Sequence, residues 1–361
     1  MRKWRLWIGI AISLVCLALA LAGIEWDQVG VALRQADWRY LIPAAASLLA
    51  YLLARSVRWR ILLGPEVSLA ETFAVTNVGY LVSNVLPFRL GDPARAVAIG
   101  LGGKLRTSAA LSTVVVERVL DMLMVVLLLA LTVPFVGEAG WTREAGMLGG
   151  AAALAALAVL VVLAQRPEWG QRALQWGLAR MRGVLPSPSV GGGVGGGGRI
   201  DRACPEPALS VVEGRSRGER WARTLGGLLD GLAALRSARR TAGLLVWSVV
   251  VWAFVVGYYF AMLWAFLDRP SLVEGSFLTC AIGLGMALPA APGAVGVFHS
   301  VARYALQLPF GVLEEEAILV AFASHAFQYV LVCLLGLVGM ARQNLSFGRL
   351  RSDVATTLEK E

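Results

Sequence analysis

Residues 108–135 read SAALSTVVVERVLDMLMVVLLLALTVPF, an apolar run that is interrupted at Glu117, Arg118 and Asp121. A helix of about 20 apolar residues crosses the ~30 Å hydrocarbon core of a bilayer, and this run is longer. At about 100° per residue, the three charged side chains lie within an arc of roughly 100° on one helix face. Because an isolated charge in hydrocarbon costs several kcal/mol, we predict a membrane-spanning helix that turns this face toward protein.

The composition of the whole chain indicates the same class. Of its 361 residues 57% are hydrophobic and 16% are charged, whereas soluble domains are about 45–50% apolar and about 25% charged. Further long apolar runs cover residues 6–23, 41–54, 145–164, 243–267 and 317–340. We therefore predict six full spans. The first resembles a cleavable signal peptide but is interpreted as a signal anchor, because no soluble domain follows it.

The formal charge of +9 has its explanation in membrane topology. Most Lys and Arg residues flank apolar runs, as the positive-inside rule describes, and no nucleic-acid recognition module is present. We expect membrane lipids rather than nucleic acid as partners, and a homo-oligomer is possible. The four cysteines form no CxxC pair, so neither a disulfide framework nor a zinc site is expected. No cofactor is expected.

Two shorter apolar segments, 72–86 and 277–288, end at proline and glycine residues that break helices. The breaking residues are Pro87, Gly91 and Pro93 in the first segment, and Pro289, Pro292, Gly293 and Gly296 in the second. We predict two re-entrant helical hairpins, at about 70–106 and 275–310. Non-helical backbone at such depth is tolerated only where protein or a water-filled cavity covers it.

The bias of Lys and Arg between loops gives one consistent topology. Both termini are cytoplasmic in it, and the two hairpins enter the membrane from opposite sides. Leu86-Pro87 followed by Gly91 matches Leu288-Pro289 followed by Gly293 at an offset of 202 residues. The predicted fold class is therefore an all-α, polytopic membrane bundle of about six full spans plus two re-entrant hairpins in an inverted-topology repeat.

Four regions follow from this reading. They are an N-terminal membrane half (1–164), a basic insert (165–240), a C-terminal membrane half (241–342) and a cytoplasmic tail (343–361). The insert holds thirteen arginines against six acids and a Gly-rich tract at 191–198. We predict a disordered cytoplasmic loop at 184–218. Its flanks, 169–182 and 221–235, are either amphipathic surface helices or extensions of the spans.

The triad Glu117, Arg118 and Asp121 is the strongest candidate site. Arg118 is expected to reach Asp121 one turn further along the helix. Two interpretations stay open: an internal salt bridge that locks helices together, or a site for a substrate or a proton.

A second candidate group, Asn84, Arg89, Asp92 and Arg95, surrounds the first break. Asp92 is predicted to cap the helix that follows, with proline at its first position. A helix N-terminus beside two arginines suits an anionic group, and arginine binds phosphate in a bidentate manner. The alternative is that these arginines only mark the cytoplasmic boundary.

A third candidate pair, His299 and Arg303, shares one face after the second break and would form the exterior half of the site. The alternative is a plain turn with a snorkelling arginine. His325, one turn from Gln328 in the last apolar run, is expected to make an interhelical hydrogen bond rather than a proton relay. Arg55, Arg58 and Arg60 are assigned mainly to topology and lipid headgroup contact.

The motifs also resemble a known family, the flippase-like membrane proteins related to the transmembrane domain of lysylphosphatidylglycerol synthases. The resemblance covers nearly the whole chain except 165–240, and it implies a bacterial or archaeal inner-membrane protein that translocates a lipid between leaflets. It depends on Asn84-Val85-Leu86-Pro87 with Gly91 and Arg95, on Glu117-Arg118 with Asp121, and on Pro289, Pro292, Gly293 and Gly296.

The sequence departs from that family in two respects. The soluble aminoacyltransferase domain of the full synthases is lacking, so lysyl transfer is not expected. Family members often carry an acid after the Pro-Gly loop, where this chain has Phe298-His299.

Three functions are compared on this basis. The first is a flippase or transporter for an anionic or polyprenyl-linked lipid, in which Arg95 and Arg118 contact the headgroup. The second is a non-catalytic scaffold or accessory subunit of a cell-envelope lipid or glycan pathway. The third, an enzyme, is disfavoured because the sequence offers no nucleotide-binding domain, metal cluster or nucleophile–base pair.

Overall fold

The computed structural model describes residues 3–86, 90–136, 237–286 and 291–345, with isolated positions at 151, 155 and 348. Every regular element in this part of the chain is a helix, so the all-α prediction is confirmed. The α-helices are α1 (Lys3–Leu21), α2 (Trp26–Gln35), α3 (Leu41–Leu63), α4 (Leu69–Val85), α5 (Gly91–Leu101), α6 (Thr107–Thr132), α10 (Ala238–Phe266), α11 (Leu272–Gly285), α12 (Val297–Phe310) and α13 (Glu314–Arg342). The 3₁₀-helices are η1 (Trp38–Tyr40), η3 (Val133–Phe135) and η5 (Pro292–Ala294).

Several sequence predictions fall outside the described residues. They are the span at 145–164, the disordered loop at 184–218 with its flanks, the cytoplasmic tail, and the individual residues Pro87, Arg89 and Pro289.

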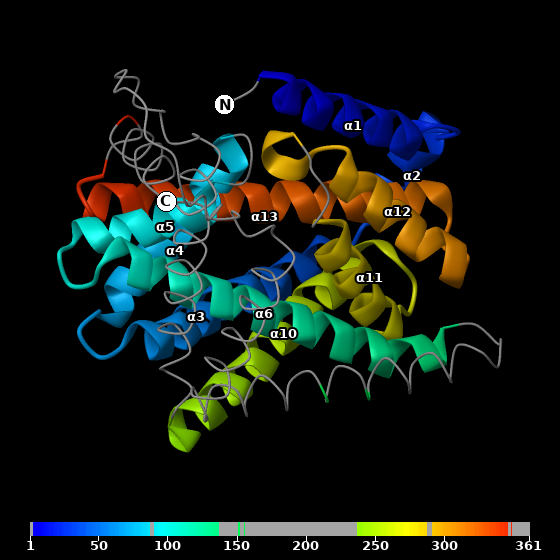
Figure 1. The fold of residues 1–361 in the computed structure, drawn as a ribbon. Helices are drawn as coiled ribbons and strands as arrows, with labels where there is room; N and C mark the ends of the chain where they lie inside the picture. Colours follow the sequence, from blue (N-terminus) through cyan, green and yellow to red (C-terminus); the bar gives the residue numbers. More distant parts are fainter. Residues whose placement is uncertain are drawn as a thin grey trace, which may run out of the picture.

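Long helices form the body of the molecule (Figure 1). α3 packs along α10, and α13 packs along α4. Three described stretches are long and apolar enough to cross a membrane: Trp38–Leu63, Ala238–Phe266 and Glu314–Arg342. The pair Ser13–Leu21 and Trp26–Gln35, bent by 80°, would add a fourth. These helices are those of a multi-pass membrane protein, and the number of six spans stays a prediction.

α6 has the length of a span, at 26 residues, but it carries the three charges of the triad. Of these, Glu117 is 0% exposed and Asp121 is 4% exposed. The expectation that the charged face turns toward protein is therefore confirmed for both acids.

The helix pair α4–α5 is tightly packed. Ser68 caps the start of α4, and its hydroxyl accepts a hydrogen bond of 3.2 Å from the backbone N–H of Glu71. A side chain at Gly91, the first residue of α5, would overlap the backbone oxygen of Gly79 and the hydroxyl of Ser83. Only glycine lets the start of α5 approach α4 so closely.

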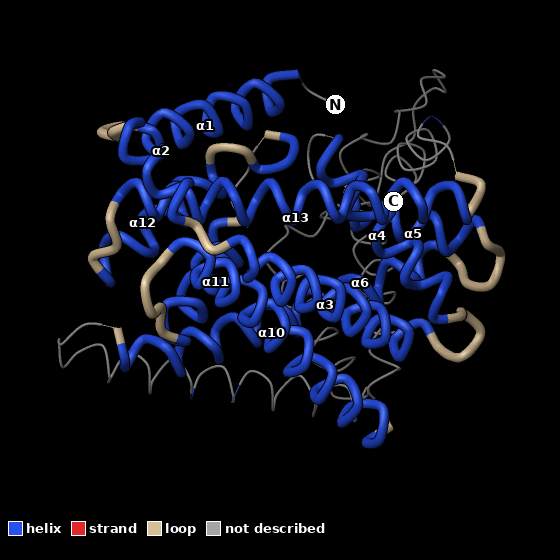
Figure 2. Tube along the Cα trace, turned by 180° about the vertical axis from the view of Figure 1, so that it is seen from behind, coloured by secondary structure: helices blue, strands red, loops and turns tan. Residues whose placement is uncertain are grey.

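The pair α11–α12 is built in a similar way. Ser271 and Glu274 form a reciprocal capping box at the start of α11, the arrangement that satisfies two free backbone donors at once. At the other end of α11, a Cβ on Gly285 would lie 2.7 Å from a methyl group of Val301 on α12. The two helix pairs lie toward opposite ends of α13 (Figures 1 and 2).

The turns of the two pairs meet near the centre of α13. Gly293, in η5, has a φ of +70°, and a Cβ there would lie 3.0 Å from the ring of Tyr329 and 3.7 Å from the backbone oxygen of Asn84. The Tyr329 hydroxyl donates a 3.4 Å hydrogen bond to that same oxygen of Asn84. The Asn84 side chain lies 3.6 Å from the sulfur of Cys333. The breaks predicted from the sequence are thus in contact with each other.

One predicted boundary is wrong in a way that bears on the site. The second apolar run was expected to end at residue 54, but α3 continues to Leu63. Arg55 and Arg58 are 5% and 0% exposed. They lie inside the helical bundle, where carboxylates on α6 compensate their charge. Arg60 is exposed, and its assignment to the membrane interface stays a prediction.

Candidate functional site

The site is a cluster of buried charges where α3, α5 and α6 meet. Arg55 and Arg58 are three residues apart on α3, so both side chains project from one helix face. One nitrogen of Arg58, Nη2, lies 2.6 Å from Asp121 Oδ1 and 3.1 Å from Glu117 Oε1. Arg55 Nη2 lies 2.9 Å from Glu117 Oε1 and 3.3 Å from Asp121 Oδ2. Two arginines and two carboxylates thus join α3 to α6.

α5 contributes a third buried arginine. Arg95 Nη2 lies 2.6 Å from Glu117 Oε2 and 3.2 Å from Asp92 Oδ1. Its guanidinium also stacks over the ring of Trp59, 4.6 Å from the ring centroid, a favourable position for a cation. Glu117 is therefore the centre of the cluster, since it pairs with three arginines from two helices.

Arg118 lies at the edge of the cluster and is more exposed than the others. Its Nε and Nη2 donate hydrogen bonds of 2.8 Å to the two oxygens of Asp92, a bidentate geometry. The predicted pair with Asp121 is longer, at 3.7 Å. About 44% of the Arg118 side chain is exposed, against 3% for Arg95.

The predicted cap at Asp92 is wrong. α5 begins at Gly91 with Leu90 in the cap position, and no side chain caps it. Asp92 lies within the first turn, where its carboxylate is taken up by Arg95 and Arg118. A negative side chain there also interacts favourably with the helix dipole.

The cluster carries one more positive than negative charge: four arginines face three carboxylates, those of Asp92, Glu117 and Asp121. Several buried donors have no hydrogen-bond acceptor among the described residues. They are Nε of Arg55, of Arg58 and of Arg95, and Nε1 of Trp252. Buried donors are normally satisfied, so this cluster has capacity for a further acceptor that carries negative charge.

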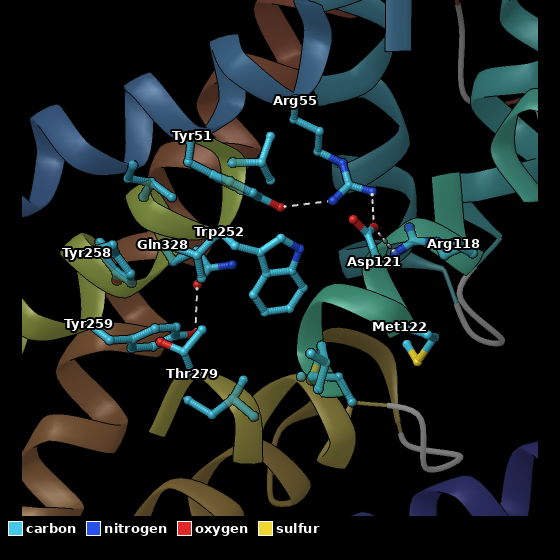
Figure 3. Close-up of a pocket in the computed structure, with 17 residues that line it drawn as sticks. Tyr51, Arg55, Arg118, Asp121, Met122, Trp252, Tyr258, Tyr259, Thr279 and Gln328 are labelled. Atoms are coloured by element: carbon cyan, nitrogen blue, oxygen red, sulfur yellow. Dashed lines mark hydrogen bonds and ion pairs between the residues drawn. The ribbon is translucent and has the colours of Figure 1, made fainter. Parts of the chain in front are cut away.

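A cavity of about 190 Å³ opens from this cluster between α3, α6, α10, α11 and α13. Its chemistry changes from one end to the other. Arg55, Arg118 and Asp121 lie at one side, Tyr258, Tyr259, Thr279 and Gln328 lie at the other, and the indole of Trp252 lies between them (Figure 3). Much of the remaining wall is apolar, from Leu48, Met122, Val125, Val251, Val255, Ile282 and Met286. The space is therefore amphipathic.

The structure places the third candidate pair elsewhere. Arg303 donates to the backbone oxygens of Leu19, Ala20 and Ala22 at the end of α1, and it pairs with Glu314 at 2.5 Å. It therefore closes the C-terminus of α1, where free carbonyls need donors, and the predicted exterior half of the site is wrong for Arg303. His299 pairs with His325 at 3.3 Å and does not line the cavity.

The remaining predicted residues have defined roles. Asn84, Gly293 and Tyr329 form the contact between the two turns. Gln328 accepts from the hydroxyl of Tyr259 at 3.5 Å, so the interhelical hydrogen bonds predicted for His325 and Gln328 are confirmed.

Sequence reasoning missed Arg55 and Arg58 as members of the site, and it did not consider Tyr51 or Trp252. The Tyr51 hydroxyl accepts from Arg55 at 3.3 Å and is hydrogen-bonded to the hydroxyl of Tyr80. One available signal was that Arg55 and Arg58 share a helix face at a spacing of three residues, as Glu117 and Asp121 do at a spacing of four on another apolar helix. Trp252 carried no comparable signal, since it is one of 12 tryptophans in the chain.

The fold and the cluster define an α-helical membrane protein with a paired network of charges inside its helical bundle. The family model for the transmembrane region of lysylphosphatidylglycerol synthases matches residues 6–336. The chain belongs to this family, and the resemblance drawn from its motifs is confirmed. No curated protein and no solved structure gives a significant match. Membership relates the protein to lipid modification or transport in the membrane.

Proposed function

We propose that this protein moves the anionic headgroup of a membrane lipid between the two leaflets of a prokaryotic cytoplasmic membrane. The cavity beside Arg55 and Arg118 is the observation that carries the proposal. A lipid has a charged end and an apolar end. The cavity likewise has charged side chains at one side, and much of its remaining wall is apolar. Phosphate is the common anionic group of lipid headgroups, and arginine binds it in a bidentate manner.

The charge balance supports one bound anion. With every member ionised, the cluster has a net charge of +1 at a place where desolvation makes an uncompensated charge costly. A headgroup phosphate with one negative charge would bring the sum to zero. It would also supply acceptors for the unfilled donors of Arg55 and Trp252, which both border the cavity.

An inverted-topology repeat would supply the movement. In such a repeat, α3, α4, α5 and α6 correspond to α10, α11, α12 and α13. Each helix contact in one half should then have an equivalent contact in the other half. α4 packs on α13 as α11 packs on α6, and α5 packs on α6 as α12 packs on α13, while α3 packs on its own counterpart α10. The first helix of each pair also begins with a similar sequence, Ser68-Leu69-Ala70-Glu71 and Ser271-Leu272-Val273-Glu274.

In this mechanism the two helix pairs are re-entrant hairpins that enter from opposite faces of the membrane, with both chain termini cytoplasmic. The headgroup contacts Arg118 first, because that side chain is the most exposed of the four arginines. It then reaches Arg55, while the lipid tails stay in the bilayer. Rocking of one half against the other exposes the cavity to either face.

We propose translocation rather than a catalysed reaction. The polar groups at the charged end of the cavity are held in ion pairs, and the described lining residues include no nucleophile hydrogen-bonded to a base, which covalent catalysis requires.

The test is leaflet exchange in proteoliposomes that contain a fluorescent anionic phospholipid and an impermeant quencher. Wild-type protein should make fluorophore from the inner leaflet accessible. Arg118→Gln should lower the initial rate about tenfold or more, equivalent to about 1.4 kcal/mol of barrier. Arg39→Gln is the matched control, because Arg39 is 91% exposed and pairs only with Asp37 among the described acids. Absence of exchange by the wild-type protein, with several anionic lipids, would refute the proposal.

A second candidate is a non-catalytic scaffold or accessory subunit. The ion pairs that join α3, α5 and α6 favour it, because such a network holds helices in one arrangement. In that case Arg118→Gln would change stability, and neither variant nor wild type would accelerate exchange.

A further inference from the structure

The only two histidines of the chain form a pair away from the charge cluster. His299, near the start of α12, is 3% exposed, whereas His325, on α13, is half-buried. His299 Nε2 lies 3.3 Å from His325 Nδ1. Aromatic rings sandwich the pair: Phe322 stacks on His299 at 4.0 Å between centroids, and Phe298 stacks on His325 at 4.4 Å.

Hydrogen bonding fixes which nitrogens carry protons. The backbone N–H of Gly296 donates to His299 Nδ1 at 3.2 Å, so that nitrogen is an acceptor and bears no proton. A neutral imidazole has one N–H, which must then be on Nε2 of His299 and point at His325 Nδ1. His325 Nδ1 is therefore an acceptor too, and the proton of His325 is on its Nε2. Each Nδ1 atom already accepts a hydrogen bond.

The pair contacts a turn whose backbone is under constraint. Gly293, Ala294 and Gly296 all have positive φ values, of +70°, +53° and +89°, a region that a residue with a Cβ, such as Ala294, rarely adopts. His299 binds Gly296 at one end of this turn, and His325 interacts with the backbone of Gly293 at the other. The two rings thus link both ends of the turn to α12 and α13.

The other titratable groups around the pair are already engaged or neutral. On α12, Arg303 is one turn from His299 but pairs with Glu314. On α13, Tyr329 lies 6.1 Å from His325 between ring centroids. On α1, Cys16 is the titratable residue that contacts α12, and its backbone oxygen accepts a hydrogen bond from Ser300. Among the described residues, no carboxylate forms an ion pair with either histidine, so nothing charged compensates a proton added there.

We propose that the His299–His325 pair is a proton-binding site that controls the turn at 293–296. One proton from solvent, reaching the pair through the half-buried ring of His325, forms one N–H bond and leaves a charge of +1. Both unprotonated ring nitrogens of the pair already accept a hydrogen bond. The added proton must therefore break either the Gly296–His299 bond or the bond between the rings. Protonation therefore releases either the Gly296 end of the turn or the hydrogen bond between the two rings that hold its ends. Coupling of this release to lipid movement rests on the proposed function, for which it supplies proton binding as the driving reaction.

The first test does not depend on transport. The full-length protein is labelled with ¹⁵N-histidine and placed in nanodiscs, and its ring resonances are followed as pH is lowered. Since the chain has two histidines, each signal is resolved. We expect both rings as the Nε2–H tautomer at high pH and a shift of both sets of resonances in the same step, as interacting sites titrate together. Two independent titrations, or a proton on His299 Nδ1 at high pH, would overturn the proposal.

The second test compares leaflet exchange in proteoliposomes with and without an imposed pH gradient. The gradient should change the wild-type rate severalfold, and an ionophore that collapses the gradient should abolish the change. His299→Gln and His325→Gln should lose this response, whereas the exposed control Arg39→Gln, which keeps both histidines, should retain it. If the wild-type rate is the same with and without the gradient, coupling of proton binding to lipid movement is overturned. If no exchange occurs at all, the proposed function is refuted, and the histidine titration stands as an independent result.

Discussion

Arg118 on α6 donates two hydrogen bonds of 2.8 Å to the two carboxylate oxygens of Asp92 on α5. The pair connects a long helix to the start of the second helix of the α4–α5 pair. Both side chains are partly exposed, at 44% and 33%, and Arg118 also borders the cavity. A movement of α5 relative to α6 would have to open this contact.

A double-mutant cycle measures that contact. Arg118→Gln, Asp92→Asn and the double variant should show a coupling of about 0.5–1 kcal/mol in the free energy of unfolding, because a bidentate pair that is partly exposed contributes modestly. Unfolding in mixed micelles with a denaturing detergent gives the values. Additive effects of the two substitutions would show that the pair does not interact in the folded protein.

Glu117 should be the residue whose loss destabilises the protein most within the cluster. Glu117→Gln leaves Arg55, Arg58 and Arg95 without their shared partner at a fully buried position. Removing one partner of a buried pair typically costs about 3–5 kcal/mol. The same unfolding measurement, with the exposed Glu66→Gln as control, checks this. Equal stability of the two variants would contradict a structural role for the network.

The close approach of α4 and α5 predicts an asymmetry between two glycine substitutions. Gly91→Ala should destabilise the protein by about 1–3 kcal/mol, as overpacking usually does, because the new methyl group overlaps Gly79 and Ser83. Gly30→Ala, in α2, meets no atom within 4 Å and should stabilise by about 0.5–1 kcal/mol. Thermal unfolding of both variants tests the packing, and a neutral Gly91→Ala would contradict it.

The contact of Asn84 with Cys333 offers a reversible lock. In a variant with Ser at positions 16, 204 and 280, Asn84→Cys should form a disulfide with the native Cys333, because the wild-type side chains lie 3.6 Å apart. Under oxidation, leaflet exchange should stop, because the first turn is then fixed to α13. A reducing agent should restore it.

The parent variant with Asn84 and Cys333 intact controls for the oxidant. Exchange that continues at full rate in the cross-linked protein would show that the turn does not move during translocation.

The sequence was sufficient to predict the helical class, the ends of α4 and α11 just before residues 87 and 289, and the burial of the two acids on α6. These features follow from local chemistry: apolar runs of known length, proline and glycine, and charges that hydrocarbon does not tolerate. The same reasoning misplaced Arg55 and Arg58, because a lone helix with arginines at its end has the pattern of a membrane boundary. Arg55 and Arg58 can be buried only because Glu117 and Asp121 lie beside them in the folded protein.

Two further features depend on distant segments. The cap expected at Asp92 was displaced by ion pairs with Arg95 and Arg118, and the role expected for Arg303 was replaced by its bonds to the end of α1. Residues from five helices line the cavity, so no local sequence pattern predicts it. A further similarity is visible in the sequence, between Ser68-Leu69-Ala70-Glu71 and Ser271-Leu272-Val273-Glu274. It supports a repeat only together with the similar packing of the helices that follow.

The central claim is that the cavity beside Arg55 and Arg118 holds the headgroup of an anionic lipid. Native mass spectrometry of the purified protein tests it directly. The wild-type protein and the Arg39→Gln control should each retain one anionic lipid per chain. The double variant with Arg55→Gln and Arg118→Gln should lose that lipid. Equal retention of the lipid by all three proteins, or no bound anionic lipid in the wild type, would contradict the account.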